Sequence, residues 1–174
     1  ANGDGLDQRS LLNIFKIGSS VGGARAKILV SQEKKTGRIL PGDIASGEDY
    51  DHYLVKLDIK EDIPYSRELV EFAYYQTATA LGIEMMESRL IEGKHFATLR
   101  FDRLRGRKTH VRTATGLTGW DFRTPRESSY ENLFNLALTL KLDHRESEQL
   151  FRRMVFNVVF ANHDDHLKNH SFPY

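Results

Sequence analysis

An apolar helical pattern that runs directly into a dense polar segment constrains the fold of this chain more than any other feature. Apolar side chains recur at helical spacing over residues 150–159, and their wide stripe predicts a buried helix. Three His, two Asp, two Asn and one Lys then crowd into residues 162–170. Polar groups are costly in a core, so this concentration indicates a functional site at the end of the helix.

Asp164 and Asn169 lie five positions apart in this segment, which is the D-x-x-x-x-N spacing of a protein-kinase catalytic loop. Phosphoryl transfer needs a carboxylate that orients the attacking hydroxyl and an oxygen ligand for Mg²⁺. Lys168 adds a cation for the transferred phosphate. Two other interpretations stay open. One is a polar helix end capped by Asn162 or Asp164, and the other is a zinc site made by His163, His166 and His170.

A glycine-rich segment near the front of the chain is a candidate phosphate site. Residues 18–23 read Gly-Ser-Ser-Val-Gly-Gly, and Arg25 and Lys27 follow with two cations. Glycines allow backbone N–H groups to approach a phosphate closely, although a plain turn has the same composition. The segment is not a P-loop, because no Gly-Lys-Ser/Thr closes it.

Lys56 lies in the second of two strands predicted at residues 26–31 and 53–57, which a loop or loose hairpin joins. Kinases use a strand lysine to hold ATP phosphates and to pair with a helix glutamate. The helix predicted to open at residues 64–66 supplies Glu68 and Glu71. The plainer alternative is a solvated lysine at a sheet edge.

Turn and cap residues place the remaining elements. The pairs Glu92-Gly93 and Arg105-Gly106 each predict a hairpin turn, and Gly82 marks the end of the preceding helix. Ser128 with Glu131, and Asp143 with Glu146, predict capped starts of two helices. Strands therefore come first and helices last, which predicts an α+β fold with a β-rich part over residues 1–115 and a helical part over residues 116–174.

Composition narrows the functional classes. The 174 residues carry a net charge of +1, which does not favour nucleic-acid binding by bulk electrostatics. The absence of cysteine excludes disulfides, thiolate zinc sites and a cysteine nucleophile. No apolar run approaches the roughly 20 residues of a membrane helix, and no signal-peptide pattern is present, so we expect a cytoplasmic protein. A local basic patch stays open as an alternative, for example around Arg100, Arg103, Arg105, Arg107 and Lys108.

Taken together, these motifs resemble the HipA-like serine/threonine kinases, the toxin components of bacterial toxin–antitoxin modules. The resemblance covers nearly the whole chain, at residues 18–27, 52–57, 71–83, 100–103, 129–131, 152–157 and 162–172. It implies a two-lobed, protein-kinase-like fold with a β-rich N-terminal part and a helical C-terminal part. The second metal-binding Asp of the family comes beyond the catalytic loop, so we expect this chain to be an incomplete part of that fold.

The resemblance also implies roles for individual residues. Asp164 is expected to be the catalytic base, Asn169 a Mg²⁺ ligand and Lys56 a ligand of the ATP phosphates. Ser20 matches a serine that the family autophosphorylates, which ejects its loop from the nucleotide site. Further cofactor contacts are expected at Val21, Gly22, Gly23, Lys27, at the adenine-contacting hinge residues Thr113, Ala114 and Thr115, and at His166 and Lys168.

The implied cofactors are ATP and Mg²⁺, and the implied acceptor is a protein hydroxyl, in this family including translation enzymes such as aminoacyl-tRNA synthetases. A DNA-binding antitoxin is the expected partner, so that any contact with DNA is indirect, and no membrane contact is expected. Two alternatives stay open. One is a catalytically inactive nucleotide-binding or antitoxin-binding module, and the other is a lipid kinase of the phosphoinositide type.

Overall fold

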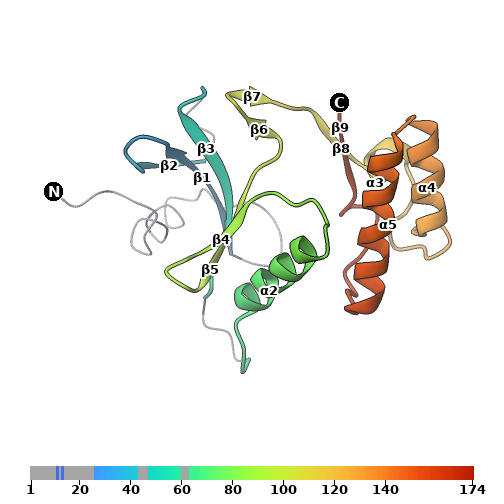
Figure 1. Ribbon diagram of the computed structural model, residues 1–174, viewed down its shortest axis with the longest axis horizontal. Helices are drawn as coiled ribbons and strands as arrows, with labels where there is room; N and C mark the ends of the chain where they lie inside the picture. The colour runs from blue at the N-terminus through green and yellow to red at the C-terminus, as the bar shows by residue number, and fades with distance from the viewer. Residues whose placement is uncertain (1–10, 12, 14–25, 43–46, 60–62) are drawn as a thin grey trace. The chain divides into compact units, whose positions relative to one another are not determined.

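The computed structural model describes residues 11, 13, 26–42, 47–59 and 63–174, and these residues show a mixed α+β architecture with antiparallel strands and helices (Figure 1). They divide into two units. The first comprises Ala1–Ala80 and Met85–Lys108, and the second comprises Leu81–Glu84 and Thr109–Tyr174. The hinge stretch predicted at residues 113–115 thus belongs to the same unit as the helices that follow it.

A five-stranded antiparallel sheet in the order β2-β1-β3-β5-β4 forms the first unit. Its alternating apolar residues face one side, so that buried Ile28 lies opposite Val55 and buried Val30 lies opposite Tyr53. These four residues form a core with Leu11, Leu57, Ile91 and Ala97. The strands are β1 (Lys27–Glu33), β2 (Ile39–Pro41), β3 (Tyr50–Lys56), β4 (Ser88–Ile91) and β5 (His95–Leu99). The strands predicted at residues 26–31 and 53–57 are confirmed.

Helix α2 (Arg67–Ala80) covers part of this sheet, where it contacts β4 and β5. Its C-terminal end lies just before Gly82, which has a φ of +77°. Glycine reaches this left-handed region without steric cost, so the predicted C-terminal cap is confirmed. The helix therefore begins and ends where its local sequence places it.

Both predicted hairpin turns are present in the first unit. Glu92 and Gly93 have φ values of +50° and +69° between β4 and β5. Arg105 and Gly106 have φ values of +50° and +71° between β6 (Arg103–Leu104) and β7 (Arg107–Lys108). Two successive positive φ angles characterise the type I′ turn, which suits the right-handed twist of paired strands.

Residues far apart in the sequence meet in the second unit. Strand β8 (Val111–Thr113) pairs antiparallel with β9 (Ser171–Pro173), with Val111 opposite Pro173 and Thr113 opposite Ser171 (Figure 1). Three helices lie between these strands in the chain: α3 (Ala114–Thr118), α4 (Tyr130–Thr139) and α5 (His144–Val159). The buried core of the unit consists of Ala114, Leu133, Leu136 and Leu167.

The helix caps of this unit confirm one prediction and correct another. Asp143 and Glu146 form the predicted capping box, because each side chain accepts the backbone N–H of the other at 2.8 and 2.9 Å. For α4, the cap is Ser129, whose hydroxyl accepts the N–H of Asn132 at 3.2 Å. The prediction that Ser128 pairs with Glu131 is therefore wrong by one residue, because Ser129 is the residue immediately before the first helical turn.

The apolar stripe of α5 is not buried as predicted. Phe151, Val155, Val158 and Val159 are 52%, 42%, 73% and 69% exposed, whereas Phe156 is buried. Helix α4 contacts α5, and yet these four side chains stay exposed. Periodicity identifies the apolar face of a helix but not what covers it. None of the described helices combines the length and apolar character needed to cross a bilayer.

The two hairpin glycines provide a matched test of packing around the sheet. A Cβ on Gly93 meets nothing within 4 Å, whereas a Cβ on Gly106 lies 2.9 Å from the carbonyl carbon of Gly47. Gly93→Ala should cost about 1 kcal/mol through its positive φ alone. Gly106→Ala should cost about 1–3 kcal/mol more, because backbone atoms must move. Urea denaturation measures both, and equal losses of unfolding free energy would contradict this packing.

Candidate functional site

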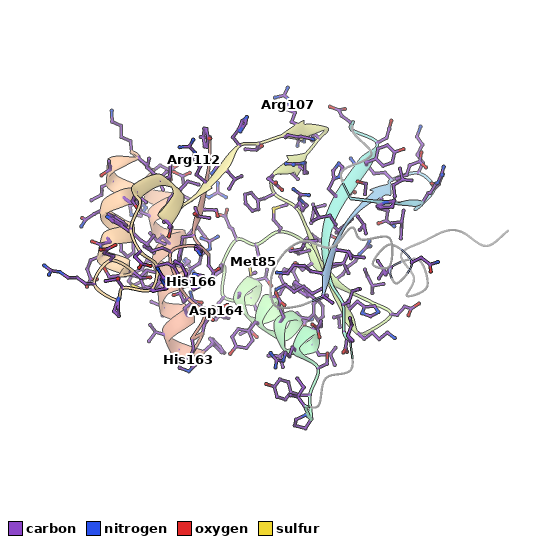
Figure 2. The ribbon with its side chains drawn as sticks, turned by 180° about the vertical axis from the view of Figure 1, so that it is seen from behind. Met85, Arg107, Arg112, His163, Asp164 and His166 are labelled. Carbon is purple, nitrogen blue, oxygen red and sulfur yellow. The ribbon has the colours of Figure 1, made fainter. Side chains whose placement is uncertain are left out.

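The segment that leaves the C-terminal end of α5 carries His163, Asp164 and His166 (Figure 2). The backbone N–H of Asp164 donates to Oδ1 of Asn162 at 3.2 Å, and its side chain is 90% exposed. Asn169 closes the loop from the other side, because its amide nitrogen donates to the backbone carbonyl of Asp164. The structure thus brings together the two residues that share the D-x-x-x-x-N spacing.

The oxygen atoms of this loop suit a hard divalent cation. The amide nitrogen of Asn169 is occupied by the Asp164 carbonyl, and none of the described residues donates to the Asn169 amide oxygen. Among the described residues, the Asp164 carboxylate forms one ion-pair contact, between Oδ1 and His166 Nε2 at 3.4 Å. Carboxylate and amide oxygens are ligands that Mg²⁺ accepts, together with water and phosphate oxygens. The side chains present therefore fit the predicted metal.

Phe122 organises the two other predicted residues of the loop. The ammonium of Lys168 lies 3.7 Å from the centroid of the Phe122 ring, a cation–π contact. The ring of His166 packs edge-on against the same phenyl at 5.1 Å between centroids. Nδ1 of His166 is buried without a hydrogen-bond partner among the described residues. Phe122 carries no motif in the sequence, and sequence reasoning did not select it.

The predicted hinge residues are tied to the loop by backbone bonds. The hydroxyl of Thr113 accepts the N–H of Gly116 at 3.0 Å and caps α3. Ala114 is fully buried, and its N–H donates to the carbonyl of His170 at 2.8 Å. The hydroxyl oxygen of Thr115 is buried and has no partner in the described part of the chain. Thr113, Ala114 and the loop thus meet in one unit through the β8–β9 pair.

Asp165, next to Asp164, has the opposite environment. Its side chain is only 14% exposed, and it accepts the hydroxyl of Tyr130 at 2.5 Å and Nε2 of His170 at 3.0 Å. Burial acts to raise the pKa of Asp165, but the hydrogen bonds from His170 and Tyr130 outweigh it and hold the pKa below its ordinary value. Burial and the bond to this carboxylate raise the pKa of Tyr130, so the phenol keeps its proton.

Sequence reasoning selected Asp164 but gave no role to Asp165 or Tyr130. The sequence shows only that two aspartates are adjacent. Neither a helix-end pattern nor a loop pattern indicates which of the two is buried. Burial separates them, because one carboxylate faces solvent and the other lies among donors. The partners of Asp165 come from the start of α4, 35 positions away, and from His170, five positions away.

Lys56 lies at the end of β3 in the first unit and forms an ion pair with Glu71 of α2. Both side chains are about one-third exposed, at 29% and 34%. Of the two candidate glutamate partners in the sequence, Glu71 forms the ion pair and Glu68 is buried. Lys27 lies directly opposite Lys56 in the β1–β3 ladder. The first unit thus places two of the predicted phosphate-binding cations at one end of the sheet.

Other predicted residues do not enter these two groups. Ser20, Val21, Gly22 and Gly23 lie outside the described residues. Among the residues that are described, no three His, Asp or Glu side chains gather to hold a metal ion, and His170 is bonded to Asp165 instead. In the candidate basic patch, Arg100 and Arg103 both pair with Asp102, at 2.8 and 2.9 Å.

Comparison with protein families gives a match over most of the chain. The family model described as the HipA-like C-terminal domain matches residues 19–174, which include both groups of predicted residues. No curated protein matches the chain at a significant level.

The environment of Asp165 predicts how the stability of the protein depends on pH. Because its folded-state pKa lies below the ordinary value of 3.8, the ionised carboxylate stabilises the fold above that pH, and this contribution is lost as the pH falls through the folded-state pKa. Asp165→Asn should therefore lower the unfolding free energy by about 2 kcal/mol at neutral pH. Its difference from the wild type should shrink below pH 3.8.

Urea denaturation at a series of pH values measures this effect. Asp164→Asn is the matched control, since its carboxylate is 90% exposed and the change should stay within about 0.5 kcal/mol. Equal effects of the two substitutions at neutral pH would show that Asp165 has no special role in the fold.

Proposed function

The chain belongs to the family of HipA-like C-terminal domains, and we propose that it is an ATP- and Mg²⁺-dependent kinase that phosphorylates serine or threonine hydroxyls of proteins. The observation that carries this proposal is the ion pair of Lys56 and Glu71. Protein kinases require a strand lysine paired with a helix glutamate, because the glutamate orients the ammonium that holds the ATP phosphates. Here the strand is β3, the helix is α2, and Glu71 is the glutamate that pairs with the lysine.

Asp164 supplies the base in this proposal. Its carboxylate accepts the proton of the acceptor hydroxyl while the hydroxyl oxygen bonds to the γ-phosphorus of ATP. The bond from that phosphorus to the β–γ bridging oxygen breaks, and the products are a phosphoester and ADP. The 90% exposure of the side chain supports this role, since a base must reach a protein substrate. The bond from Asn169 to the Asp164 carbonyl supports it further, because it fixes the backbone that carries the base.

The remaining loop residues serve the phosphate. When bound, Mg²⁺ neutralises charge that develops on the phosphate oxygens, and the Asn169 amide oxygen is the group that would hold it. Lys168 approaches the transferred phosphate from its place on the Phe122 ring, where it is already desolvated on one side. The family match supports assigning both residues to this function.

The family also supports a proposal for the biological setting. We infer that the chain acts as the toxin of a bacterial toxin–antitoxin pair, with a DNA-binding antitoxin as partner and a translation enzyme among its substrates. The resemblance that suggests this setting also suggests Ser20 as an acceptor within the same chain, and that serine provides a substrate for a direct assay.

Asp164→Asn tests the proposed base. The substitution keeps the size of the side chain but removes its ability to take a proton, so the rate of phosphoryl transfer should fall by about 10²–10⁴-fold. Incorporation of γ-phosphate from ATP, with mass spectrometry of the peptide that contains Ser20, measures the transfer. Asp49→Asn, at an exposed position of the first unit, is the control and should retain full activity. Undiminished transfer by Asp164→Asn would remove Asp164 from the mechanism.

Lys56 and Glu71 are tested by nucleotide binding. Lys56→Met should weaken ATP binding by about tenfold or more, because a charged contact to phosphate is lost. Glu71→Gln should weaken it less, since the lysine remains but is no longer oriented. A fluorescent ATP analogue measures both, and Lys35→Met, an exposed lysine of the β1–β2 connection, is the control. An unchanged Kd in Lys56→Met would exclude this lysine from the nucleotide site.

A further inference from the structure

A continuous chain of hydrogen bonds leads from the backbone of Asp164 to the side chain of its neighbour Asp165. The N–H of Asp164 donates to Asn162 Oδ1 at 3.2 Å, and Asn162 Nδ2 donates to Asn157 Oδ1 at 3.1 Å. Asn157 Nδ2 then donates to the Tyr130 hydroxyl at 3.0 Å, and this hydroxyl donates to Asp165 Oδ2 at 2.5 Å. Because Asp164 and Asp165 are covalent neighbours, the bonds close a ring.

Simple chemistry fixes the direction of every bond in this ring. A backbone N–H only donates, so the Asn162 atom that faces Asp164 is the amide oxygen, and its nitrogen faces Asn157. The facing atom of Asn157 is then its oxygen, which leaves its nitrogen for the Tyr130 hydroxyl. At the other end, an ionised carboxylate only accepts. All the donors therefore point the same way and end on the negative charge of Asp165, an arrangement in which each bond polarises the next.

The ring draws on parts of the second unit that do not share a local motif. Tyr130 is the first residue of α4, Asn157 lies in the last turn of α5, and Asn162 follows that helix. The other carboxylate oxygen of Asp165 bonds to His170, whose backbone carbonyl accepts the N–H of Ala114. The ring of His170 also packs edge-on against that of Tyr130, at 5.8 Å between centroids. The hinge stretch, both helices and the loop are thus connected through one carboxylate.

We propose that this ring is a positioning device for Asp164, and that the Tyr130 hydroxyl is its central link. Neither Tyr130 nor Asp165 touches the reacting atoms. The ring holds the backbone before and after Asp164, whose exposed side chain forms one long ion-pair contact among the described residues, to His166 at 3.4 Å. Small errors in the position of a catalytic group cost large factors in rate, so a base on a solvent-exposed loop needs such support. The catalytic part of this proposal rests on the proposed function.

Tyr130→Phe tests the ring without altering the shape of the side chain. It removes the donor to Asp165 and the acceptor of Asn157 in a single step. Amide hydrogen exchange of the peptide that covers residues 160–168 should become about tenfold faster, because the loop opens more often. This measurement needs no enzymatic activity. Tyr65→Phe, at a residue that is 57% exposed in the first unit, is the control and should leave the exchange unchanged.

A second substitution shows whether the bonds act as one ring. Asn162→Ala removes the acceptor of the Asp164 N–H, lies at an exposed position and should accelerate the same exchange by about tenfold. Combined with Tyr130→Phe, it should add less than about twofold, since both changes break the same ring. Multiplicative effects of the two substitutions would overturn the ring as a unit.

Kinetics separate positioning from general stability. In Tyr130→Phe the kcat of phosphoryl transfer should fall by about tenfold while the Kd for ATP stays at the wild-type value, because only the base is displaced. Wild-type kcat together with faster exchange would overturn the positioning role. Unchanged exchange would overturn the ring itself. If the wild-type chain transfers no phosphate under any condition, the proposed function fails, and the exchange data still decide whether the ring holds the loop.

Discussion

The buried negative charge of Asp165 is the interaction on which the second unit depends. An ionised carboxylate that leaves water must receive hydrogen bonds, and here the donors come from the first residue of α4 and from the residue just before β9. Leu167, two residues on, is buried among Ala114, Leu133 and Leu136. Polar and apolar anchors thus hold the loop at Asp165 and Leu167, two positions apart, while the side chain of Asp164, just before them, stays in solvent.

The first unit uses charge in a different way. Lys27 and Lys56 face each other across the β1–β3 ladder, and like charges in directly opposite positions are unfavourable. Glu71 offsets this repulsion from α2, which contacts the neighbouring strands β4 and β5. The second unit therefore stabilises the carboxylate of Asp165 with hydrogen-bond donors. In the first unit, the carboxylate of Glu71 stabilises the lysine cations instead. In the proposed function the held carboxylate of Asp165 supports its neighbour Asp164, which would take the proton of the acceptor hydroxyl, and the lysines of the first unit would bind the phosphates.

The parts of the structure that follow from short sequence windows were predictable. The hairpin turns at Glu92-Gly93 and Arg105-Gly106 need positive φ at two adjacent residues, and glycine marks such turns locally. The loop of Asp164 and Asn169 was also predictable, because its D-x-x-x-x-N spacing lies within a short sequence window. The pairing of β8 with β9 was not, because it joins residues 111–113 to residues 171–173 through strands too short to show a period. The exposure of the α5 stripe was not predictable either, since periodicity does not identify a partner surface.

The closed ring around Asp164 also constrains how this sequence can change. The ring is made by Tyr130, Asn157, Asn162 and Asp165, and each hydrogen bond uses a group that its neighbour provides. Replacing one of these side chains therefore leaves a donor or an acceptor of the neighbouring residue without its partner. Substitutions at these four positions are therefore not independent steps. A related chain that lacks the hydroxyl at the position of Tyr130 should differ at the other positions too. These residues should vary together over evolutionary time, although 27 positions separate Tyr130 from Asn157 in the sequence.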